Sequence, residues 1–300
     1  MKAKTIKAVL TKKHKDFVAS IQDEEVRNLV DKNSIITGGS IVSMLLNEKV
    51  NDFDYYFTDK ATVLAVANYY VNKFNELNPG KSPFPVVVET DERVRIRVQS
   101  AGVASETQES EYQYFETVDP SEGTEYVEQI VEVLNEEVEE KPNYRPIFLT
   151  DNAITLSGKI QLVIRFFGEP EVIHDNYDFI HAMCYWRSEN NHLDLPRNSL
   201  EAILTRELVY HGSRYPLASV IRTRKFIQRG WTINAGQYLK MCLQINELDL
   251  NDIKVLEDQL TGMDAAYFVQ ILSYLKKRIE EDENFKLTSA YLIEIIDRMF

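Results

Sequence analysis

The sequence predicts an α+β protein, with a mixed α/β head followed by an all-helical C-terminal region. Short runs of β-type alternation are interleaved with helical patterns up to about residue 179, and only helical spacing recurs after it. The chain has 300 residues, of which 44% are apolar, enough for two hydrophobic cores. We therefore expect a head at residues 1–190 and a helical domain at residues 191–300.

The head begins with helices and a glycine turn. Apolar residues recur at helical spacing over the first thirty residues, before a turn at 31–34. A strand is then expected from residue 35 to Gly38-Gly39, followed by a short helix and a second strand that carries Asp52 and Asp54. Residues 60–77 have the amphipathic pattern of a longer helix.

The remaining elements of the head are expected to be strands, and those of the tail helices. Arg93, Arg95 and Arg97 share one face of an alternating run, where they either contact phosphates or form an exposed sheet face. The predicted strands are 84–89, 93–98, 147–149, 153–156, 159–166 and 177–179. The predicted helices of the tail are 199–210, 216–229, 235–246, 251–260, 264–281 and 287–300.

An acidic insertion at about residues 100–142 dominates the charge of the chain. The formal net charge is −13, and thirteen Asp and Glu residues, with no Lys or Arg, lie between Arg97 and Lys141. The rest of the chain is therefore neutral, and the net charge does not exclude a polynucleotide partner for basic segments such as 214–229. The insertion is either a solvated helix or a mobile flap that repels misplaced phosphates.

The sequence contains no apolar stretch long enough to cross a bilayer, and no apolar run of signal-peptide type follows its basic N-terminus. We expect a cytoplasmic protein without a membrane partner. The sequence does not disclose an oligomeric state.

The strongest chemical signal is the glycine pair together with the two aspartates. Backbone N–H groups at Gly38, Gly39 and Ser40 can approach phosphate oxygens closely, because glycine has no Cβ and a helix starts there. Asp52 and Asp54 are two residues apart on a predicted strand, so both carboxylates point to one side and can hold a divalent cation. Structural alternatives are an ordinary turn and solvated loop carboxylates. The combination predicts metal-dependent nucleotidyl transfer.

Two further groups are candidates for the same site. Asp178 is an acid framed by apolar residues, which can serve as a third metal-facing carboxylate or bind a ribose hydroxyl, or can be a plain edge-strand aspartate. Arg222, Lys225 and Arg229 share one face of a predicted helix. That face suits a triphosphate or an RNA backbone, and equally a solvated basic surface that pairs with the acidic insertion.

These residues resemble the polymerase-β-like nucleotidyltransferase superfamily, and within it the bacterial type of CCA-adding enzyme and poly(A) polymerase. Gly38-Gly39 followed by Asp52-x-Asp54 is similar to the first motif of that family. The run 178–185 is similar to its second motif, with Asn176 and Tyr177 in place of two arginines. Segments within 216–233 are similar to its helical Pro-Leu-Arg…Arg-Phe…Gly-Phe-x-Ile pattern.

The resemblance implies a nucleotidyltransferase-type head that moves a nucleoside monophosphate from an NTP to an acceptor hydroxyl with Mg²⁺ or Mn²⁺. It implies an RNA (tRNA-like) 3′ end as acceptor, with ATP favoured as donor. The stretch that matches the family's base-reading Glu-Asp-x-x-Arg is 214–218, Arg-Tyr-Pro-Leu-Ala, which lacks both base-reading side chains. The alternatives are transfer to a protein or small molecule, and an inactive nucleotide- or RNA-binding module.

Overall fold

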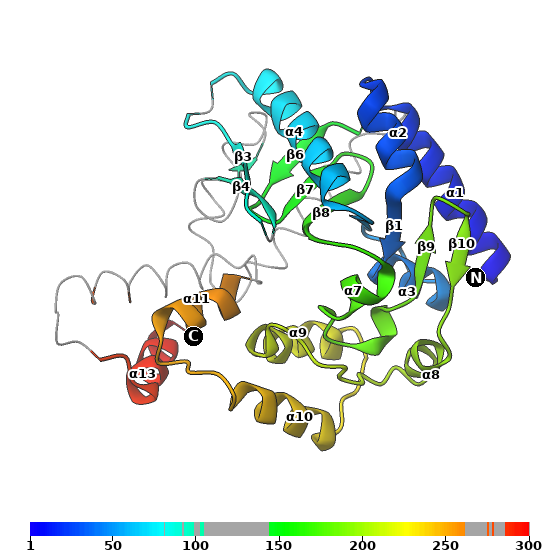
Figure 1. Cartoon of the computed structure of the whole chain (residues 1–300). Helices are drawn as coiled ribbons and strands as arrows, with labels where there is room; N and C mark the ends of the chain where they lie inside the picture. Colours follow the sequence, from blue (N-terminus) through cyan, green and yellow to red (C-terminus); the bar gives the residue numbers. More distant parts are fainter. Residues whose placement is uncertain are drawn as a thin grey trace.

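The central feature of the fold is an eight-stranded mixed sheet (Figure 1). This computed structural model describes residues 1–80, 82–91, 93–98, 103–104, 144–261, 275, 278 and 286–299. The strand order is β10-β9-β1-β2-β8-β7-β6-β5. Strands β2 and β8 run parallel, and the other neighbouring pairs of this sheet are antiparallel. The strands are β1 (Ser34–Thr37), β2 (Phe53–Phe57), β5 (Val103–Ala104), β6 (Pro146–Leu149), β7 (Ala153–Leu156), β8 (Ile160–Phe167), β9 (Tyr185–Arg187) and β10 (His192–Asp194).

One face of the sheet is covered by the helices of the head. These are α1 (Ala3–Ala19), α2 (Glu24–Asn33) and α4 (Lys60–Leu77). Apolar residues of all three pack with Tyr55 and Phe57 of β2 and with Leu162 of β8 in the main core. A separate hairpin of β3 (Val86–Glu89) and β4 (Val94–Arg97) lies next to α4. The predicted helices and strands of this region are confirmed.

The opposite face carries a smaller cluster and the chemistry-bearing side chains. Ile35, Tyr56 and Ile173 form the centre of this cluster, and Val163, Phe166 and Tyr177 pack against it. Ile173 belongs to α7 (Pro170–His174), a short helix that follows β8. Because side chains alternate along β2, Asp54 lies on the same face as Tyr56.

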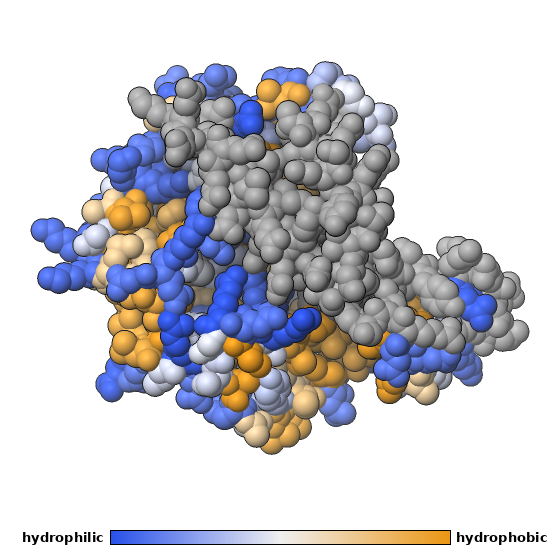
Figure 2. Space-filling view, turned by 180° about the vertical axis from the view of Figure 1, so that it is seen from behind, coloured by the Kyte–Doolittle hydropathy of each residue, from blue (hydrophilic) through white to orange (hydrophobic). Residues whose placement is uncertain are grey.

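The C-terminal region is helical, as predicted, after a short 3₁₀ helix η2 (Ile180–Ala182) and the β9–β10 hairpin. Leu208, Trp231 and Met241 join the main core, whereas Leu256, Leu275 and Ile295 belong to a second, smaller core. Leu239 and Leu243 of α10 are exposed, and apolar patches lie toward the lower edge of the face in Figure 2. The helices of this region are α8 (Arg197–Thr205), α9 (Pro216–Gln228), α10 (Ala235–Ile245), α11 (Ile253–Thr261) and α13 (Ser289–Met299). The remaining short helix, α3 (Gly39–Leu46), belongs to the head and lies between β1 and β2 in sequence.

Two expectations about strands are wrong. Residues 177–179 form no strand and have only an isolated bridge, from Phe179 to Tyr210, because α7 turns the chain away from the sheet just before them. A hairpin of β9 and β10 occurs where only helices were expected, and β9 pairs with β1. Its turn places Asn191 at a positive φ of 49°, a conformation that asparagine tolerates.

The acidic insertion lies outside the described residues, apart from β5, which pairs with β6 at the edge of the sheet. The same holds for most of the helix expected at 264–281. None of the helices that the structure describes is long and apolar enough to cross a membrane.

Candidate functional site

The glycine turn lies directly beside Asp54. Strand β1 ends at Thr37, whose Cα partner on β2 is Asp54, and α3 begins two residues later. Gly38 has φ +87°, and a Cβ added to it would lie 3.1 Å from Asp54 Oδ2. A side chain at position 38 would therefore be strained and would crowd the carboxylate. The expected juxtaposition of this turn with Asp54 is present.

Asp52 and Asp54 form an electrostatically coupled pair. Asp52 lies just before β2 and Asp54 within it, and both side chains are half-buried. Burial raises the pKa of Asp54 well above its ordinary value, and the nearby charge of Asp52 raises it further. Burial also raises the pKa of Asp52. Two crowded carboxylates that resist ionisation are the kind of pair that a divalent cation stabilises.

The start of α3 presents an unsatisfied polar atom to the same region. Ser40 is 2% exposed, and its Oγ has no hydrogen-bond partner among the residues that the structure describes. Gly39 is exposed, and a Cβ added there would meet nothing within 4 Å. Buried hydroxyls normally have partners, so the orphaned Oγ next to open backbone indicates a position for a ligand oxygen.

Three neighbours of the pair were not identified from the sequence. Tyr177 is half-buried, and its hydroxyl would lie 3.6 Å from a Cβ added at Gly38. Gln161 of β8 is the register partner of Asp54, which puts a neutral amide beside it. Lys159 stabilises the ionised form of Asp52. β8 lies next to β2 in the sheet, although about a hundred residues separate the two strands in sequence. This pairing brings Lys159 and Gln161 to the aspartates, and Tyr177 reaches them after α7.

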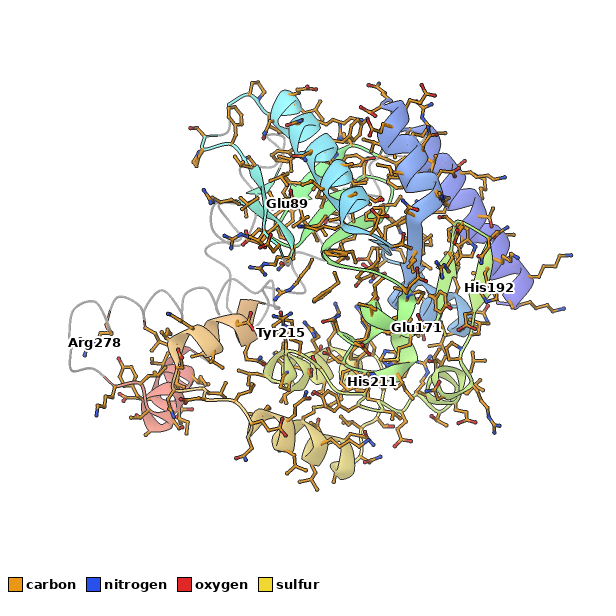
Figure 3. All side chains as sticks on the ribbon, in the orientation of Figure 1. Glu89, Glu171, His192, His211, Tyr215 and Arg278 are labelled. Carbon is orange, nitrogen blue, oxygen red and sulfur yellow. The ribbon has the colours of Figure 1, made fainter. Side chains whose placement is uncertain are left out.

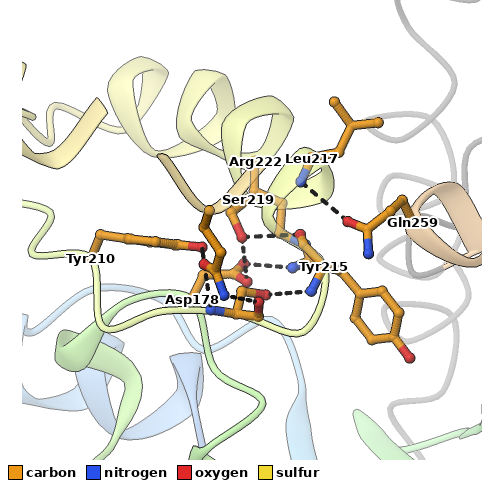
Figure 4. Close-up of polar contacts among 9 residues, drawn as sticks. Asp178, Tyr210, Tyr215, Leu217, Ser219, Arg222 and Gln259 are labelled. Atoms are coloured by element: carbon orange, nitrogen blue, oxygen red, sulfur yellow. Dashed lines mark hydrogen bonds and ion pairs between the residues drawn. The ribbon is translucent and has the colours of Figure 1, made fainter. Parts of the chain in front are cut away.

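Asp178 is held by the helical region (Figure 4). Its Oδ1 accepts a 2.8 Å hydrogen bond from Ser219 Oγ, and its Oδ2 accepts one from Arg222 Nη1. The carboxylate is 8% exposed, and both partners lie on α9. Within the described part of the chain, no group of three or more His, Cys, Asp or Glu side chains is arranged for a metal ion. The structure does not bring Asp178 to Asp52 and Asp54 as a third ligand.

The three predicted cations divide between Asp178 and the aspartate pair. Arg222 pairs with Asp178. Burial raises the pKa of Tyr56, next to the aspartates, and the nearby charge of Arg222 partly opposes this rise. Lys225 stabilises the charged forms of both Asp52 and Asp54, and Arg229 that of Asp52. The basic face of α9 therefore lies against the candidate site.

Comparison with known proteins identifies the family of this chain. A model of the Gabija anti-defense 2 protein family matches residues 8–206, about two thirds of the sequence. The chain belongs to the Gabija anti-defense 2 family. A curated relative, "Gabija anti-defense 2" of Bacillus phage SPbetaL7, is 25% identical over 134 residues, which are 44% of this chain. The match spans only 32% of that relative's length.

Among solved structures, this member of the Gabija anti-defense 2 family is weakly similar to CCA-adding enzymes. The Thermotoga maritima enzyme complexed with tRNA gives a TM-score of 0.38 at 13% identity, covering 78% of this chain and 45% of the enzyme. The Bacillus stearothermophilus enzyme in complex with CTP gives 0.36 at 11% identity, covering 87% and 51%.

Proposed function

We propose that this chain is a metal-dependent nucleotidyltransferase that moves a nucleoside monophosphate from an NTP to an acceptor hydroxyl. The observation that carries the proposal is the contact of the glycine turn with the aspartate pair, with Gly38 next to Asp54 Oδ2. A phosphate-binding turn and a metal-binding pair at one place are what the transfer of a phosphoryl-containing group requires.

The residues have separate roles in this proposal. Asp52 and Asp54 would hold Mg²⁺, or Mn²⁺, which when bound activates the acceptor oxygen and neutralises charge on the departing pyrophosphate. Gly38, Gly39 and the free Ser40 Oγ would bind the β- and γ-phosphates. A new bond forms between the acceptor oxygen and the α-phosphorus. The bond between the α-phosphorus and the oxygen that bridges to the β-phosphate breaks, so pyrophosphate leaves, and the hydroxyl proton passes to solvent.

The basic face of α9 would complete the site. Lys225 and Arg229 act on Asp52 across the site and are positioned for the triphosphate or the acceptor strand. Asp178 would fix Arg222, and with it α9, against the head rather than bind metal. The proposed acceptor is an RNA 3′ end, and ATP is the favoured donor.

The first test is transfer of label to RNA by the full chain. Incubation with Mg²⁺, mixed RNA and each of the four α-labelled NTPs should label the RNA, with ATP the best donor. The double variant Asp52→Asn and Asp54→Asn should lower the rate at least ~1000-fold, because the loss of metal binding removes several kcal/mol of transition-state stabilisation. An exposed control, Asp249→Asn, should retain the rate. Undiminished labelling by the double variant would refute the assignment.

The family favours a second candidate acceptor. The name Gabija anti-defense 2 concerns a defence system called Gabija, so a component of that system is a possible target of transfer. Intact-mass analysis of Gabija proteins after incubation with the chain, ATP and Mg²⁺ would show an added nucleoside monophosphate. Labelled RNA with unmodified proteins would favour the first acceptor, and the reverse result the second.

A further inference from the structure

A cleft away from the aspartates is lined by arginines and aromatic rings. Its volume is about 360 Å³, and Arg93, Arg165 and Arg214 contribute to its walls. Phe166, Phe167 and Tyr215 line it as well. The cleft lies between β4, the end of β8 and the residues just before α9, and Figure 3 shows Tyr215 between the strands and the helical region.

The charge of this cleft is positive. Asp258 is the one acidic residue among its lining residues, and its Oδ1 lies 3.9 Å from Arg165 Nη2. Asp151 also lies near these arginines, but Arg95 is the first of the cations that act on its carboxylate. Arg93 and Arg214 form no ion pair with any residue that the structure describes. Among the described residues no acid pairs with Arg214, and Arg93 acts on Asp151 together with Arg95 and Arg165, so the cleft keeps a net positive charge.

Arg165 is built into the cleft rather than placed on its surface. The residue is 7% exposed and donates through Nη2 to the Tyr215 hydroxyl. Its guanidinium carbon lies 4.5 Å from the centre of the Tyr215 ring and 5.5 Å from that of Phe166. Its Nη1 is buried and has no hydrogen-bond partner within the described part of the chain. Unpartnered buried guanidinium donors are costly, and an anionic oxygen is the partner they suit best.

Three segments connect the cleft with the candidate active site. Strand β8 passes Asp54 at Gln161 and reaches the cleft at Arg165, four residues or about 13 Å further along. Asn176 lines the cleft and directly precedes Tyr177, which faces the glycine turn. Helix α9 leads from Tyr215 to Lys225, ten residues or about 15 Å away. Both estimates place the cleft roughly 15 Å from the aspartates.

We propose that this cleft binds one nucleotide unit of a single-stranded RNA acceptor, upstream of the 3′ end that receives the new nucleotide. Arg93, Arg165 and Arg214 hold its phosphates, and the half-buried rings of Phe166 and Phe167 stack with a base. Proteins that bind single-stranded nucleic acids without sequence specificity commonly combine arginine side chains with aromatic side chains. Such binding supplies affinity for the acceptor although the base-reading side chains are absent. The inference rests on the proposed function.

The test measures binding separately from transfer. The dissociation constant of a short fluorescent RNA is measured by anisotropy with the full chain, in EDTA and without NTP. Arg93→Gln combined with Arg214→Gln should weaken binding at least ~10-fold and lower the slope of log K against log salt by about 1.4, because two phosphate contacts are lost. Both arginines lie at the surface of the cleft, so the fold is retained. Arg197→Gln, an exposed arginine of α8, is the matched control and should bind as the wild type does.

The outcomes separate this inference from the proposed function. The cleft assignment is overturned if the double arginine variant binds RNA as tightly as the wild type does. It is also overturned if the wild type does not bind RNA. RNA binding that depends on both arginines, without any transfer to RNA, refutes RNA as the acceptor in the proposed function but supports the cleft. Asp52→Asn with Asp54→Asn should abolish transfer and leave RNA binding in EDTA unchanged.

Discussion

At the scale of single residues, the aspartates show how similar side chains take different roles. Asp52 and Asp54 lie two residues apart, with Asp54 beside the glycine turn, and burial raises the pKa of both. Asp178 resembles them in sequence context, but a hydroxyl and a guanidinium from α9 occupy its oxygens. A strand pattern predicts which way a carboxylate points, but not which partner reaches it.

Two buried histidines predict the response of the fold to acid. Burial lowers the pKa of both His174 and His181 to about 4, and for His174 the nearby His211 contributes. In the unfolded chain the pKa of a histidine is about 6.5, so below that pH the unfolded state binds more protons than the folded state does. Stability that is present above pH ~6.5 is therefore lost as the pH falls toward ~4. At pH 5 the expected loss in unfolding free energy is about 2 kcal/mol for each histidine.

A variant assigns this loss to its source. His181 lies among aromatic rings, 4.3 Å from Trp231 and 4.9 Å from Phe226 between ring centres, so His181→Phe keeps the packing and removes the titration. Urea unfolding at pH 7.5 and pH 5 should show a smaller pH dependence for His181→Phe than for the wild type. His192→Gln, on the exposed part of β10, should leave the dependence unchanged. Equal pH dependence in all three proteins would contradict the assignment.

At the scale of elements, the turn between β1 and α3 does the most for the candidate site. The two glycines of this turn have different surroundings, although they are adjacent in sequence. Gly38 is buried at φ +87° next to Asp54, whereas Gly39 is the exposed first residue of α3. Only the first of them is required by the backbone.

Alanine at each glycine separates folding from phosphate binding. Gly38→Ala should cost about 1–2 kcal/mol of unfolding free energy, because of the positive φ and the approach to Asp54 Oδ2. Gly39→Ala should leave stability within about 0.5 kcal/mol, since its Cβ meets nothing. It should raise the KM for ATP by about 10-fold, because the Cβ would occupy the path of the phosphates. A wild-type KM in Gly39→Ala would place the phosphates elsewhere.

The sequence predicted neither the β9–β10 hairpin nor the arginine-lined cleft, because both depend on how elements pack together. Residues 185–194 form two three-residue strands, too short for alternation to show them, and pairing with β1 is what makes them a sheet. The sequence offered two roles for Arg93, contact with phosphates or a place on an exposed sheet face. It contained no sign that Arg165 and Arg214, from two distant segments, would line the same cleft.

At the scale of the whole molecule, the two predicted domains share a core. A division into residues 1–190 and 191–300 stays a prediction, but Leu208, Trp231 and Met241 of the second part lie in the main core. The smaller core of Leu256, Leu275 and Ile295 lies beyond α10. We infer that the head needs the first helices of the tail in order to fold.

Two fragments test this dependence. A fragment of residues 1–190 should lack cooperative thermal unfolding, because it loses five buried side chains of the main core, each contributing about 2 kcal/mol. They are Ile203, Leu208, Tyr210, Trp231 and Met241. A fragment of residues 1–248 keeps that core and should unfold cooperatively, as calorimetry would show. A cooperative transition in the 1–190 fragment would establish the head as an independent domain.

The sequence by itself determined the α+β class, most helices and strands, and the residues of the glycine turn and the aspartate pair. It did so because these features depend on local periodicity and on residue types a few positions apart. Tertiary structure alone decided that Asp178 pairs with Arg222, that Gln161 and Tyr177 adjoin the aspartates, and that three arginines line one cleft. Those contacts join segments separated by forty to more than a hundred residues, and only strand pairing and core packing bring them together.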